Sequence, residues 1–545
     1  MTSHPEFPRF RAQGDAAVMV HLGRGIDPHL GRAVRALADR LTGRPAPGQR
    51  EVMPGYATVQ VQFDPLVTDH AEVEDHVRGV LAGLPPAAEH SPRVVEVPVV
   101  YGGEHGPDLE FLERHTGLAA SEIIERHTAP LYPCYLVGFT PGFPFLGGLD
   151  PALAAPRLDS PRAGLLPGAV GIAGQQTGLY PLGGPGGWRI MGRTPLMVFN
   201  PLAEPPALIL PGDLVRFTAV EDAAFPLPPV ADQPWDPTGR SVWEVLTPGC
   251  ATVQDAGRWG RQNLGVPMAG ALDQAALRAA NRLVGNPPDA AGLELTLLGP
   301  RLKALTPLTL ALCGADLGAS LDGRALPRDR AVKMEPGQIL AFRGPRDGSR
   351  AFLAVAGGLA APLILGSRAT YPLGLMGGPL APGQVLSALP PAGPPAHGPL
   401  PAELAPRPPR GVLLLRATAA PNPEFFGEAG RRALFGTVWK LSPRSDRRGV
   451  RLTGGQVPLA PGVPTSIVSE PNAPGIVQVP ADGQPIILLR DQTTGGYAKA
   501  ATVIGPDLDL LARALPGQEV ALTEVTPPEA VAAARDYAAR EAAWA

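Results

Sequence analysis

The sequence predicts a β-rich α+β protein of several domains, and three observations support this. The chain has 545 residues, too many for one ordinary hydrophobic core. Gly (66) and Pro (68) make up nearly a quarter of it, and they punctuate Val- and Leu-rich stretches, which is typical of turn-dense β structure. Helical periodicity is confined to a few short segments.

Residues 1–90 are expected to form an α+β subdomain. Alternating apolar residues in AAVMVHLG (16–23) and ATVQVQFDP (57–65) predict strands. HLGRAVRALADRL (29–41) and DHAEVEDHVRGVLAGL (69–84) have the spacing of amphipathic helices.

Residues 91–225 are expected to form a β-domain. They begin with a strand, a Gly turn and two short helices, and from 131 they continue as short strands joined by Gly/Pro turns. The Pro-rich, polar residues 226–240 are predicted to be a linker.

The second half is expected to repeat this order. Residues 241–400 form its first subdomain, with a clear helix at 271–285, and 401–530 form a second β-domain. Residues 531–545 are assigned to a C-terminal helix.

A distant internal repeat supports two copies of one β-domain. A shift of 307 residues superimposes mainly turn glycines and prolines, which set the backbone, while other side chains differ. Chance in a Gly/Pro-rich chain is the alternative. The matched positions are Gly142, Gly147, Gly148, Pro151, Pro167, Gly168, Val170 and Ile172 with Gly449, Gly454, Gly455, Pro458, Pro474, Gly475, Val477 and Val479.

Charge and composition exclude several classes of protein. The formal net charge is -3 without a Lys/Arg block, which argues against nucleic acid or an anionic membrane as the main partner. The N-terminus lacks the features of a signal peptide, and no stretch approaches the roughly 20 apolar residues of a membrane span. The three cysteines, Cys134, Cys250 and Cys313, are far apart, which suits a reducing cytosol, so we expect a cytoplasmic protein.

Phosphate binding, if present, cannot use a P-loop, because no G-x-x-x-x-G-K-[ST] occurs. Only four of the 47 basic residues are lysines, so arginines, backbone amides or helix N-termini must hold any phosphate. Lys333 lies in a faint match to a biotin-carrier turn, and we expect no biotin on this chain.

In the first half, two glycine-rich stretches carry candidate binding residues. GFTPGFPFLGGLD (138–150) contains Phe139, Gly142 and Phe143, of which at least one ring is expected to line a cleft. Residues 170–195 place amide, hydroxyl, aromatic and guanidinium groups on turns, where they could bind a polar planar ligand or merely satisfy turn backbones. These residues are Gln175, Gln176, Thr177, Tyr180, Trp188 and Arg193.

In the second half, carboxylates are the candidates for acid–base chemistry, because nine of the ten histidines lie at or before His127 and the tenth is in a Pro-rich segment. Three polar clusters contain Asp255 with Arg258, Glu470, and Asp491 with Gln492 and Thr493. The last cluster follows an apolar strand, a common position for functional groups. His127 is a further catalytic candidate, because it shortly precedes the 138–150 stretch.

The motifs resemble a known family. VPVVYGGEHGPDL, GFTPGFPFLGGLD and GIAGQQTGLYPLGGPGGWRIMGRTP look like the B component of 5-oxoprolinase, once called allophanate hydrolase subunit 1, and are similar to a sporulation-kinase inhibitor. TPGCATVQDAGRWGRQNLGVPMAGALDQAALRAANRLVGN, SEPNAPGIVQVPADGQPI and DQTTGGYAKAATVIGPDLD look like the C component. The chain therefore resembles a fusion of B and C, the pair that also forms the carboxyltransferase region of urea carboxylase. Asp273 and Gln478 lie in these motifs, and we include them in the expected binding set.

The resemblance implies two cyclophilin-like β-barrels, each preceded by a smaller α+β subdomain, and ATP-dependent hydrolysis of 5-oxo-L-proline to L-glutamate. It implies ATP and Mg²⁺ as cofactors and the LamB/YcsF-type A component of 5-oxoprolinase as partner, with a homo-oligomer through B–C pairing as a further expectation. Arg193, Gln175, Gln176 and the 138–148 loop would face Asp255, Arg258, Glu470 and residues 491–493 across a cleft.

Two other functions stay open at this point. The chain could be a carboxyltransferase component that acts on urea or a related amide with carboxybiotin. It could instead be a binding protein that inhibits a histidine kinase.

Overall fold

The computed structural model describes residues 6–84, 92–225, 233–419 and 421–543. The linker predicted at 226–240 lies partly outside these residues. Four folded units follow one another along the chain: an N-terminal sheet with two helices, a first barrel, a β-sandwich and a second barrel.

The N-terminal unit is a four-stranded antiparallel sheet in the order β1-β2-β4-β3, with two helices on one face. Asp27 and Asp69 cap the helices, accepting hydrogen bonds from backbone N–H groups of the first turns. The predicted strands and helices of this unit are confirmed. Its elements are β1 (Arg9–Gln13), β2 (Ala17–His21), α1 (Pro28–Gly43), β3 (Gln49–Pro54), β4 (Thr58–Phe63) and α2 (His70–Ala82).

The two faces of this sheet differ in polarity. Val18, Val20, Val59 and Val61 point toward α1 and α2 and form one core. The opposite face is polar, because residues directly paired across antiparallel strands share a face, and the register pairs His21 with Thr58 and Glu51 with Gln62. We call this side the polar face; its polar residues are Arg9, Arg11, Gln13, His21, Glu51, Thr58, Gln60 and Gln62.

The first barrel is a closed sheet of seven strands in the order β10-β7-β6-β13-β5-β12-β9. Two short helices precede β6, as the sequence predicts. Its elements are β5 (Val94–Tyr101), η1 (Gly103–His105), α3 (Leu109–Thr116), α4 (Ala120–Thr128), β6 (Tyr132–Val137), β7 (Pro144–Leu146), η2 (Pro151–Leu153), β8 (Arg162–Leu165), β9 (Ala169–Ala173), β10 (Gln176–Leu179), β11 (Gly184–Gly186), β12 (Arg189–Arg193) and β13 (Leu214–Ala219).

The third unit is a sandwich of a six-stranded and a five-stranded sheet around one large core. The expectation of an α+β subdomain was wrong here, because α5 is the only α-helix over 240–400, all of which the structure describes. The two sheets bury their apolar faces on each other, so helices are not needed to cover those faces. The single helix α5 covers the outer face of β18 and β23. The elements are β14 (Arg240–Thr247), β15 (Ala251–Gln254), α5 (Gln274–Leu283), β16 (Gly292–Thr296), β17 (Arg301–Ala304), β18 (Leu308–Gly314), β19 (Ala319–Leu321), β20 (Arg324–Ala325), β21 (Ala331–Met334), β22 (Ile339–Phe342), β23 (Arg350–Val355), η3 (Pro372–Gly374) and β24 (Val385–Ala388).

The second barrel has seven strands in the order β25-β32-β29-β30-β27-β26-β33. The C-terminal helix α8 starts before residue 531, because Thr526 and Glu529 form a capping box ahead of it. The elements are β25 (Leu413–Thr418), η4 (Pro423–Phe425), α6 (Gly427–Gly436), β26 (Trp439–Leu441), β27 (Gly449–Thr453), β28 (Glu470–Pro471), β29 (Ile476–Val479), β30 (Ile486–Leu488), β31 (Thr494–Gly495), β32 (Ala498–Val503), α7 (Gly505–Arg513), β33 (Glu519–Glu524) and α8 (Pro527–Ala542).

The two barrels have the same topology, which confirms the internal repeat. In each, the first strand pairs in parallel with the last one, β5 with β13 and β25 with β33, and all other pairs are antiparallel. Gly168 and Gly475, which occupy equivalent positions in the two barrels, show why the two copies share their turn residues. Both have positive φ, and a Cβ there would lie 2.3 Å from the Thr194 carbonyl oxygen or 2.1 Å from that of Val503.

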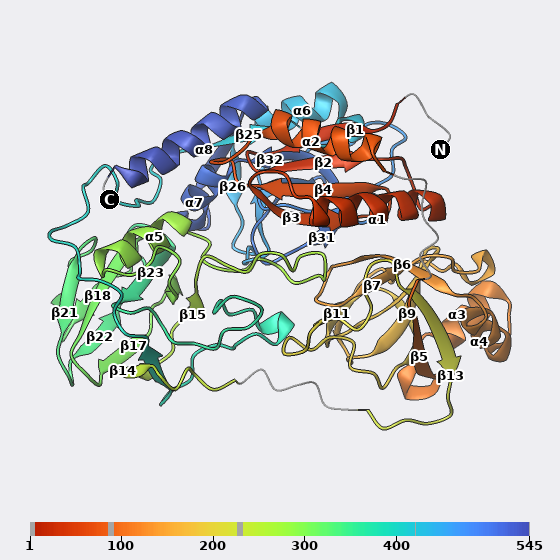
Figure 1. Ribbon diagram of the computed structural model, residues 1–545, viewed down its shortest axis with the longest axis horizontal. Helices are drawn as coiled ribbons and strands as arrows, with labels where there is room; N and C mark the ends of the chain where they lie inside the picture. The colour runs from red at the N-terminus through yellow and green to blue at the C-terminus, as the bar shows by residue number, and fades with distance from the viewer. Residues whose placement is uncertain (1–5, 85–91, 226–232, 420, 544–545) are drawn as a thin grey trace.

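The order of the units in space differs from their order in the chain. The N-terminal sheet lies beside the second barrel (Figure 1). It also contacts the first barrel, where the ring centres of Tyr56 and Tyr135 are 4.9 Å apart. The Gly14 N–H donates to Thr418 Oγ1 (3.0 Å) and the Gly505 N–H donates to Asp15 Oδ1 (2.8 Å). The first ninety residues therefore pack on a barrel more than 400 residues away.

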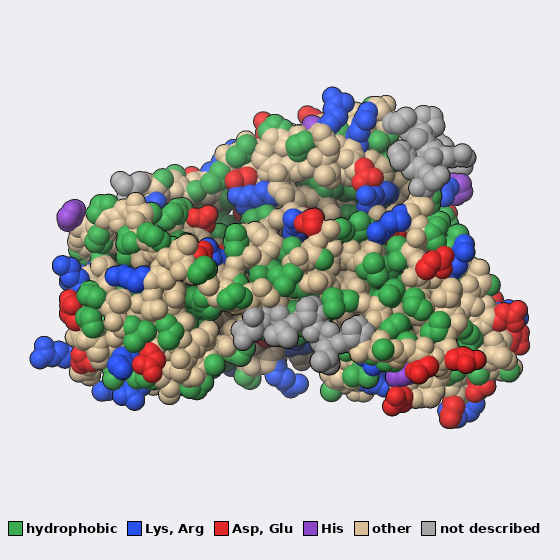
Figure 2. All heavy atoms as spheres, turned by 60° about the horizontal axis from the view of Figure 1, so that its bottom comes forward, with side chains coloured by type: hydrophobic (Ala, Val, Ile, Leu, Met, Phe, Trp, Pro, Cys, Tyr) green, Lys and Arg blue, Asp and Glu red, His purple; other side chains and the backbone are tan. Residues whose placement is uncertain are grey.

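Charged side chains of both signs are interspersed on the face shown in Figure 2. This pattern agrees with the small net charge of -3. In the described part of the chain, no helix is long and apolar enough to cross a membrane.

Candidate functional site

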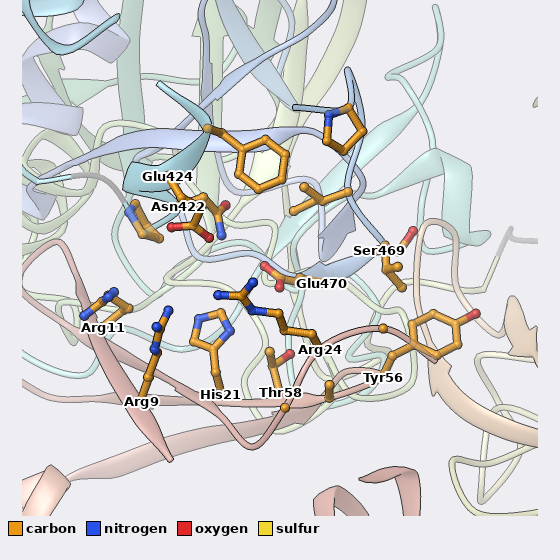
Figure 3. A pocket seen from close by; sticks show the side chains of 18 of the residues that line it. Arg9, Arg11, His21, Arg24, Tyr56, Thr58, Asn422, Glu424, Ser469 and Glu470 are labelled. Atoms are coloured by element: carbon orange, nitrogen blue, oxygen red, sulfur yellow. The ribbon is translucent and has the colours of Figure 1, made fainter. Parts of the chain in front are cut away.

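A cavity of about 340 Å³ lies between the N-terminal sheet and the second barrel (Figure 3). Residues at the ends of β1, β2 and β4 line one side of it, and residues 421–425 and 464–470 line the other. Its volume lies in the range of small-molecule sites. Because the two sides come from different halves of the chain, the cavity exists only when the N-terminal unit is docked.

The N-terminal side of the cavity is basic. Arg9, Arg11 and Arg24 line it. Arg9 and Arg24 form ion pairs with Glu6. Arg11 has no ion pair among the described residues, and its guanidinium makes only a 3.4 Å hydrogen bond to its neighbour's carbonyl. Arg11 is thus the guanidinium that is available for an anionic ligand, which an arginine can bind through two hydrogen bonds.

The opposite side contains a buried ion pair. The Lys499 side chain is fully buried, and its Nζ donates to Glu470 Oε2 (2.9 Å) and to the Pro471 carbonyl oxygen (2.8 Å). Burial alone would raise the pKa of Glu470, but the Lys499 ammonium outweighs it and holds that pKa below the ordinary value. Glu470 is therefore a carboxylate at neutral pH.

Three residues that line the cavity each have a polar atom without a hydrogen-bond partner among the described residues. These atoms are His21 Nε2, the Tyr56 hydroxyl and Thr58 Oγ1, and each atom is buried. A buried polar atom left without a partner costs about 1–3 kcal/mol, so such atoms mark a place for a ligand or water. His21 and Thr58 are opposite each other across β2 and β4, and Figure 3 shows both below Glu470.

A layer of amides continues the polar face beyond the cavity. Gln60 Nε2 donates to Gln13 Oε1 (2.5 Å) and Gln62 Nε2 donates to Gln60 Oε1 (2.9 Å). Gln62 is 3.4 Å from Gln262 of the second half. Beside them, Glu51 accepts a hydrogen bond from the Gly260 N–H (2.6 Å), and burial raises the pKa of Glu51 to about 7.

The structure brings Gln478, Gln492 and Thr493 together behind Glu470, as the sequence predicts for part of the site. Asn472 Nδ2 donates to Gln492 Oε1 (3.2 Å), whereas Gln478 Nε2, Gln492 Nε2 and Thr493 Oγ1 have no partner among the described residues. The strand β28, which carries Glu470, contacts β4 of the N-terminal sheet. This buried cluster therefore adjoins the polar face.

The 138–148 loop meets the second half, as predicted. The Phe139 N–H donates to Thr494 Oγ1 (2.7 Å) and the Gly142 N–H donates to the Leu264 carbonyl (2.9 Å). Phe139 has a φ of +66° and a side chain that is 49% exposed. A phenylalanine in the left-handed region is uncommon, and such strain is concentrated at functional sites. Phe143, Tyr180 and Trp188 instead pack in a buried aromatic cluster.

Three predicted residues of the first half do not join the second half. Gln175 is exposed and Gln176 is half-buried at the turn between β9 and β10. Arg193 donates to the Pro167 carbonyl (2.8 Å) and stacks on Phe225, 4.1 Å from its ring centre. We predicted that Arg193 faces the carboxylates of the second half. This prediction was wrong, because both of these contacts of Arg193 are with residues of the first half.

His127 lies inside the first barrel and not at the cavity. Its ring is fully buried, with Nδ1 2.8 Å from the Tyr101 hydroxyl and Nε2 2.8 Å from Thr177 Oγ1. Burial lowers the pKa of His127 to about 3, so it is neutral. We correct its predicted catalytic role: His127 and Thr177 form a hydrogen-bonded pair of the barrel core.

Asp255 and Asp273 stabilise the local structure of the second half. Asp255 accepts hydrogen bonds from Gly257 N–H (2.8 Å), the Ser367 hydroxyl (2.7 Å) and Arg368 N–H (2.6 Å). Asp273 caps α5 and forms a buried ion pair with Arg513. Neither lines the cavity.

Asp491 and Arg258 are also buried away from the cavity. Arg447 Nε donates to Asp491 (2.9 Å), and Arg447 also pairs with Glu294. Burial raises the pKa of Asp491. Arg258 Nη2 donates to the Ala369 carbonyl (2.7 Å), and burial lowers the pKa of Arg258 to about 10.

Sequence reasoning missed His21, Arg11 and Lys499. One signal was present: in ATVQVQF the residues that alternate with valine are Thr58, Gln60 and Gln62, amides and a hydroxyl rather than charges. Such a strand has a polar face that can be buried only against other hydrogen-bonding groups.

The expected Mg²⁺ has no preformed site in the described part of the chain. No group of three or more His, Cys, Asp or Glu side chains is arranged there so that it could hold a metal ion. We therefore assign no step to a metal held by this chain.

Both halves match known families. Residues 8–209 match "Carboxyltransferase domain, subdomain C and D" and residues 264–524 match "Carboxyltransferase domain, subdomain A and B". The chain is thus a two-part carboxyltransferase-domain protein.

Similarity to individual proteins shows which carboxyltransferase-domain proteins this chain is related to. The chain is 40% identical over 222 residues to the 5-oxoprolinase B component of Bacillus subtilis (39% of this chain, 92% of that protein) and 38% identical over 296 residues to the 5-oxoprolinase C component of Escherichia coli (52% and 91%). A crystal structure of TTHA0988 covers 93% of this chain and 99% of its own, with 37% identity and a TM-score of 0.83. The chain belongs to the family of the B and C components of 5-oxoprolinase, and it joins a B-like half to a C-like half.

Proposed function

We propose that the chain supplies the B and C components of a cytoplasmic, ATP-dependent 5-oxoprolinase, which converts 5-oxo-L-proline to L-glutamate with a LamB/YcsF-type A component. In this proposal the barrels are cyclophilin-like, and Mg²⁺ enters with the ATP phosphates. The homo-oligomer stays a prediction.

The cavity between the two halves is the observation that supports this function best. 5-Oxoproline is a small ring with one carboxylate and one planar amide. Among the described residues Arg11 has no ion pair and can bind the carboxylate, and the buried hydroxyl of Thr58, without a partner there, can bind the amide.

The chemistry suits such a site. A lactam resists water because amide resonance must be broken, and phosphorylation of its carbonyl oxygen activates the carbonyl carbon. Phosphoryl transfer depends on positioning and charge neutralisation more than on a covalent nucleophile.

The test is phosphate release from ATP by the purified chain, with and without 5-oxoproline, and with and without the LamB/YcsF-type partner. Release that depends on 5-oxoproline supports the proposal. No such release in any combination overturns it.

Arg11→Gln is expected to raise KM for 5-oxoproline about 10- to 100-fold with a smaller change in kcat, because a hydrogen bond to a charged group contributes about 1.5–3 kcal/mol. Steady-state kinetics of the chain with its partner measure this. Arg32→Gln, an exposed arginine on α1, is the matched control and should leave KM unchanged. An unchanged KM in Arg11→Gln would remove Arg11 from the binding site.

Carboxyl transfer is the second candidate, and the descriptions of the two matching families favour it. It requires carboxybiotin from other proteins. Transfer of labelled carboxylate from a carboxybiotinylated carrier to urea, without 5-oxoproline-dependent phosphate release, would establish it instead.

A further inference from the structure

We propose that His21 is the base that takes the proton from the attacking water, beside the buried Glu470–Lys499 ion pair. This assignment rests on the proposed hydrolysis. His21 comes from the N-terminal strand β2 and Glu470 from β28, almost 450 residues later, so docking of the two halves assembles this arrangement.

His21 has the location that a base requires. It lines the cavity at the end of β2, in the same row of the sheet as Arg9 and Thr58. Figure 3 shows its ring directed into the space below Glu470, with Arg24 close by. Its Nε2 is buried and unpartnered among the described residues, so a bound water there would gain a hydrogen bond without displacing another group.

The surroundings keep the imidazole neutral. Burial lowers the pKa of His21 below 6.5 more than Glu470 raises it, and Lys499 lowers it further. Glu424 from η4 raises the pKa and Arg11 from β1 lowers it, and Arg9 and Arg24 add positive charge on the same side. A neutral ring with its proton on Nδ1 presents the Nε2 lone pair at pH 7.

The other groups at the cavity are weaker candidates. Glu470 is held as an ion pair by the Lys499 ammonium at 2.9 Å, which reduces its tendency to accept a proton. His21 is the only histidine among the lining residues that the structure describes, since His127 lies inside the first barrel. Glu470 and Lys499 act on His21 through their charges, which have opposite effects on its pKa.

The proton transfer completes the attack on the activated lactam. One O–H bond of the water breaks, its proton passes to Nε2 of His21, and the water oxygen bonds to the carbonyl carbon of the phosphorylated lactam. The π electrons of the C–N bond move to the ring nitrogen. The imidazolium returns the proton to that nitrogen. The C–N bond then breaks with its electron pair on the nitrogen, and the added hydroxyl forms the new C=O bond as its remaining proton passes to the amino nitrogen. A second water attacks the phosphorus of the resulting acyl phosphate, and the P–O bond to the acyl oxygen breaks to give inorganic phosphate and the carboxylate.

The test compares wild type, His21→Gln and His21→Ala as full chains with the A component, ATP and 5-oxoproline. We expect kcat to fall about 100-fold or more in both variants, within the range of general base catalysis, with little change in KM. The wild-type rate should fall as the pH drops through the pKa of His21, and the variants should lose this acid limb. Added imidazole should restore part of the rate to His21→Ala.

His29→Gln is the matched control, an exposed histidine on α1 that should keep wild-type kinetics. Wild-type kcat in both His21 variants overturns the role of His21 and leaves the proposed function standing. The role of His21 is also overturned if the variants have a lower kcat but keep the acid limb of the pH–rate profile and are not rescued by imidazole. That result would indicate a structural role. Absence of 5-oxoproline-dependent phosphate release in wild type overturns both proposals together.

Discussion

Glu470→Gln should destabilise the protein by about 3–5 kcal/mol, because it leaves the fully buried Lys499 ammonium without its counter-ion. The pair lies between the second barrel and the N-terminal sheet, so we expect both units to lose stability. Denaturant unfolding followed by tryptophan fluorescence measures the effect, with Trp439 in the barrel core as one reporter.

The double variant Glu470→Gln with Lys499→Met should recover most of this loss, because it removes the second charge as well. Glu244→Gln is the matched control: its partner Lys303 is 3.4 Å away and the pair is solvent-exposed, so the change should stay within about 1 kcal/mol. A loss in Glu470→Gln no larger than in Glu244→Gln would show that the buried pair contributes little.

Glu51→Gln should stabilise the protein at pH 8 by about 3 kcal/mol. Burial raises the pKa of Glu51 from 4.5 to about 7 in the folded protein, and each unit of difference corresponds to about 1.4 kcal/mol. The unfolded chain loses this proton at lower pH than the folded chain does. The stability of wild type therefore falls as the pH rises from about 4.5 to about 7, and Gln removes this dependence while its oxygen still accepts from the Gly260 N–H.

Urea unfolding at pH 4.5, 6, 7 and 8 tests this prediction. The variant and wild type should have similar stability at pH 4.5 and diverge toward pH 8. Glu335→Gln, an exposed position, is the control and should show no divergence. A constant difference between Glu51→Gln and wild type over this range would contradict a raised pKa at Glu51.

The sequence by itself determined the local structure and the repeat. Alternation identified β2 and β4, and 3.6-residue periodicity identified α1 and α2. Turn glycines such as Gly168 and Gly475 identified two copies of one β-domain. Each of these signals reflects a steric or hydrogen-bonding requirement of the nearby backbone, so it is readable without the tertiary structure.

Part of the candidate site was predictable for the same reason. Of the predicted residues of the second half, Glu470 lines the cavity, while Gln492 and Thr493 lie in the buried cluster behind it. The contact of the 138–148 loop with the second half was also expected. The predicted site roles of His127 and Arg193 were wrong. The neighbouring sequence does not show whether a side chain points into a barrel, toward its own half or toward a cleft.

Only the tertiary structure decided which faces meet. The polar face of the N-terminal sheet is buried partly against residues 260–262 and partly against the second barrel, and the second contact places His21 and Arg11 beside Glu470. Local periodicity shows that a strand has a polar side, but the partner of that side is fixed by long-range burial. Buried amides and charges need complementary partners. Neighbouring amides of the sheet and residues 260–262 supply the partners of Gln60, Gln62 and Glu51.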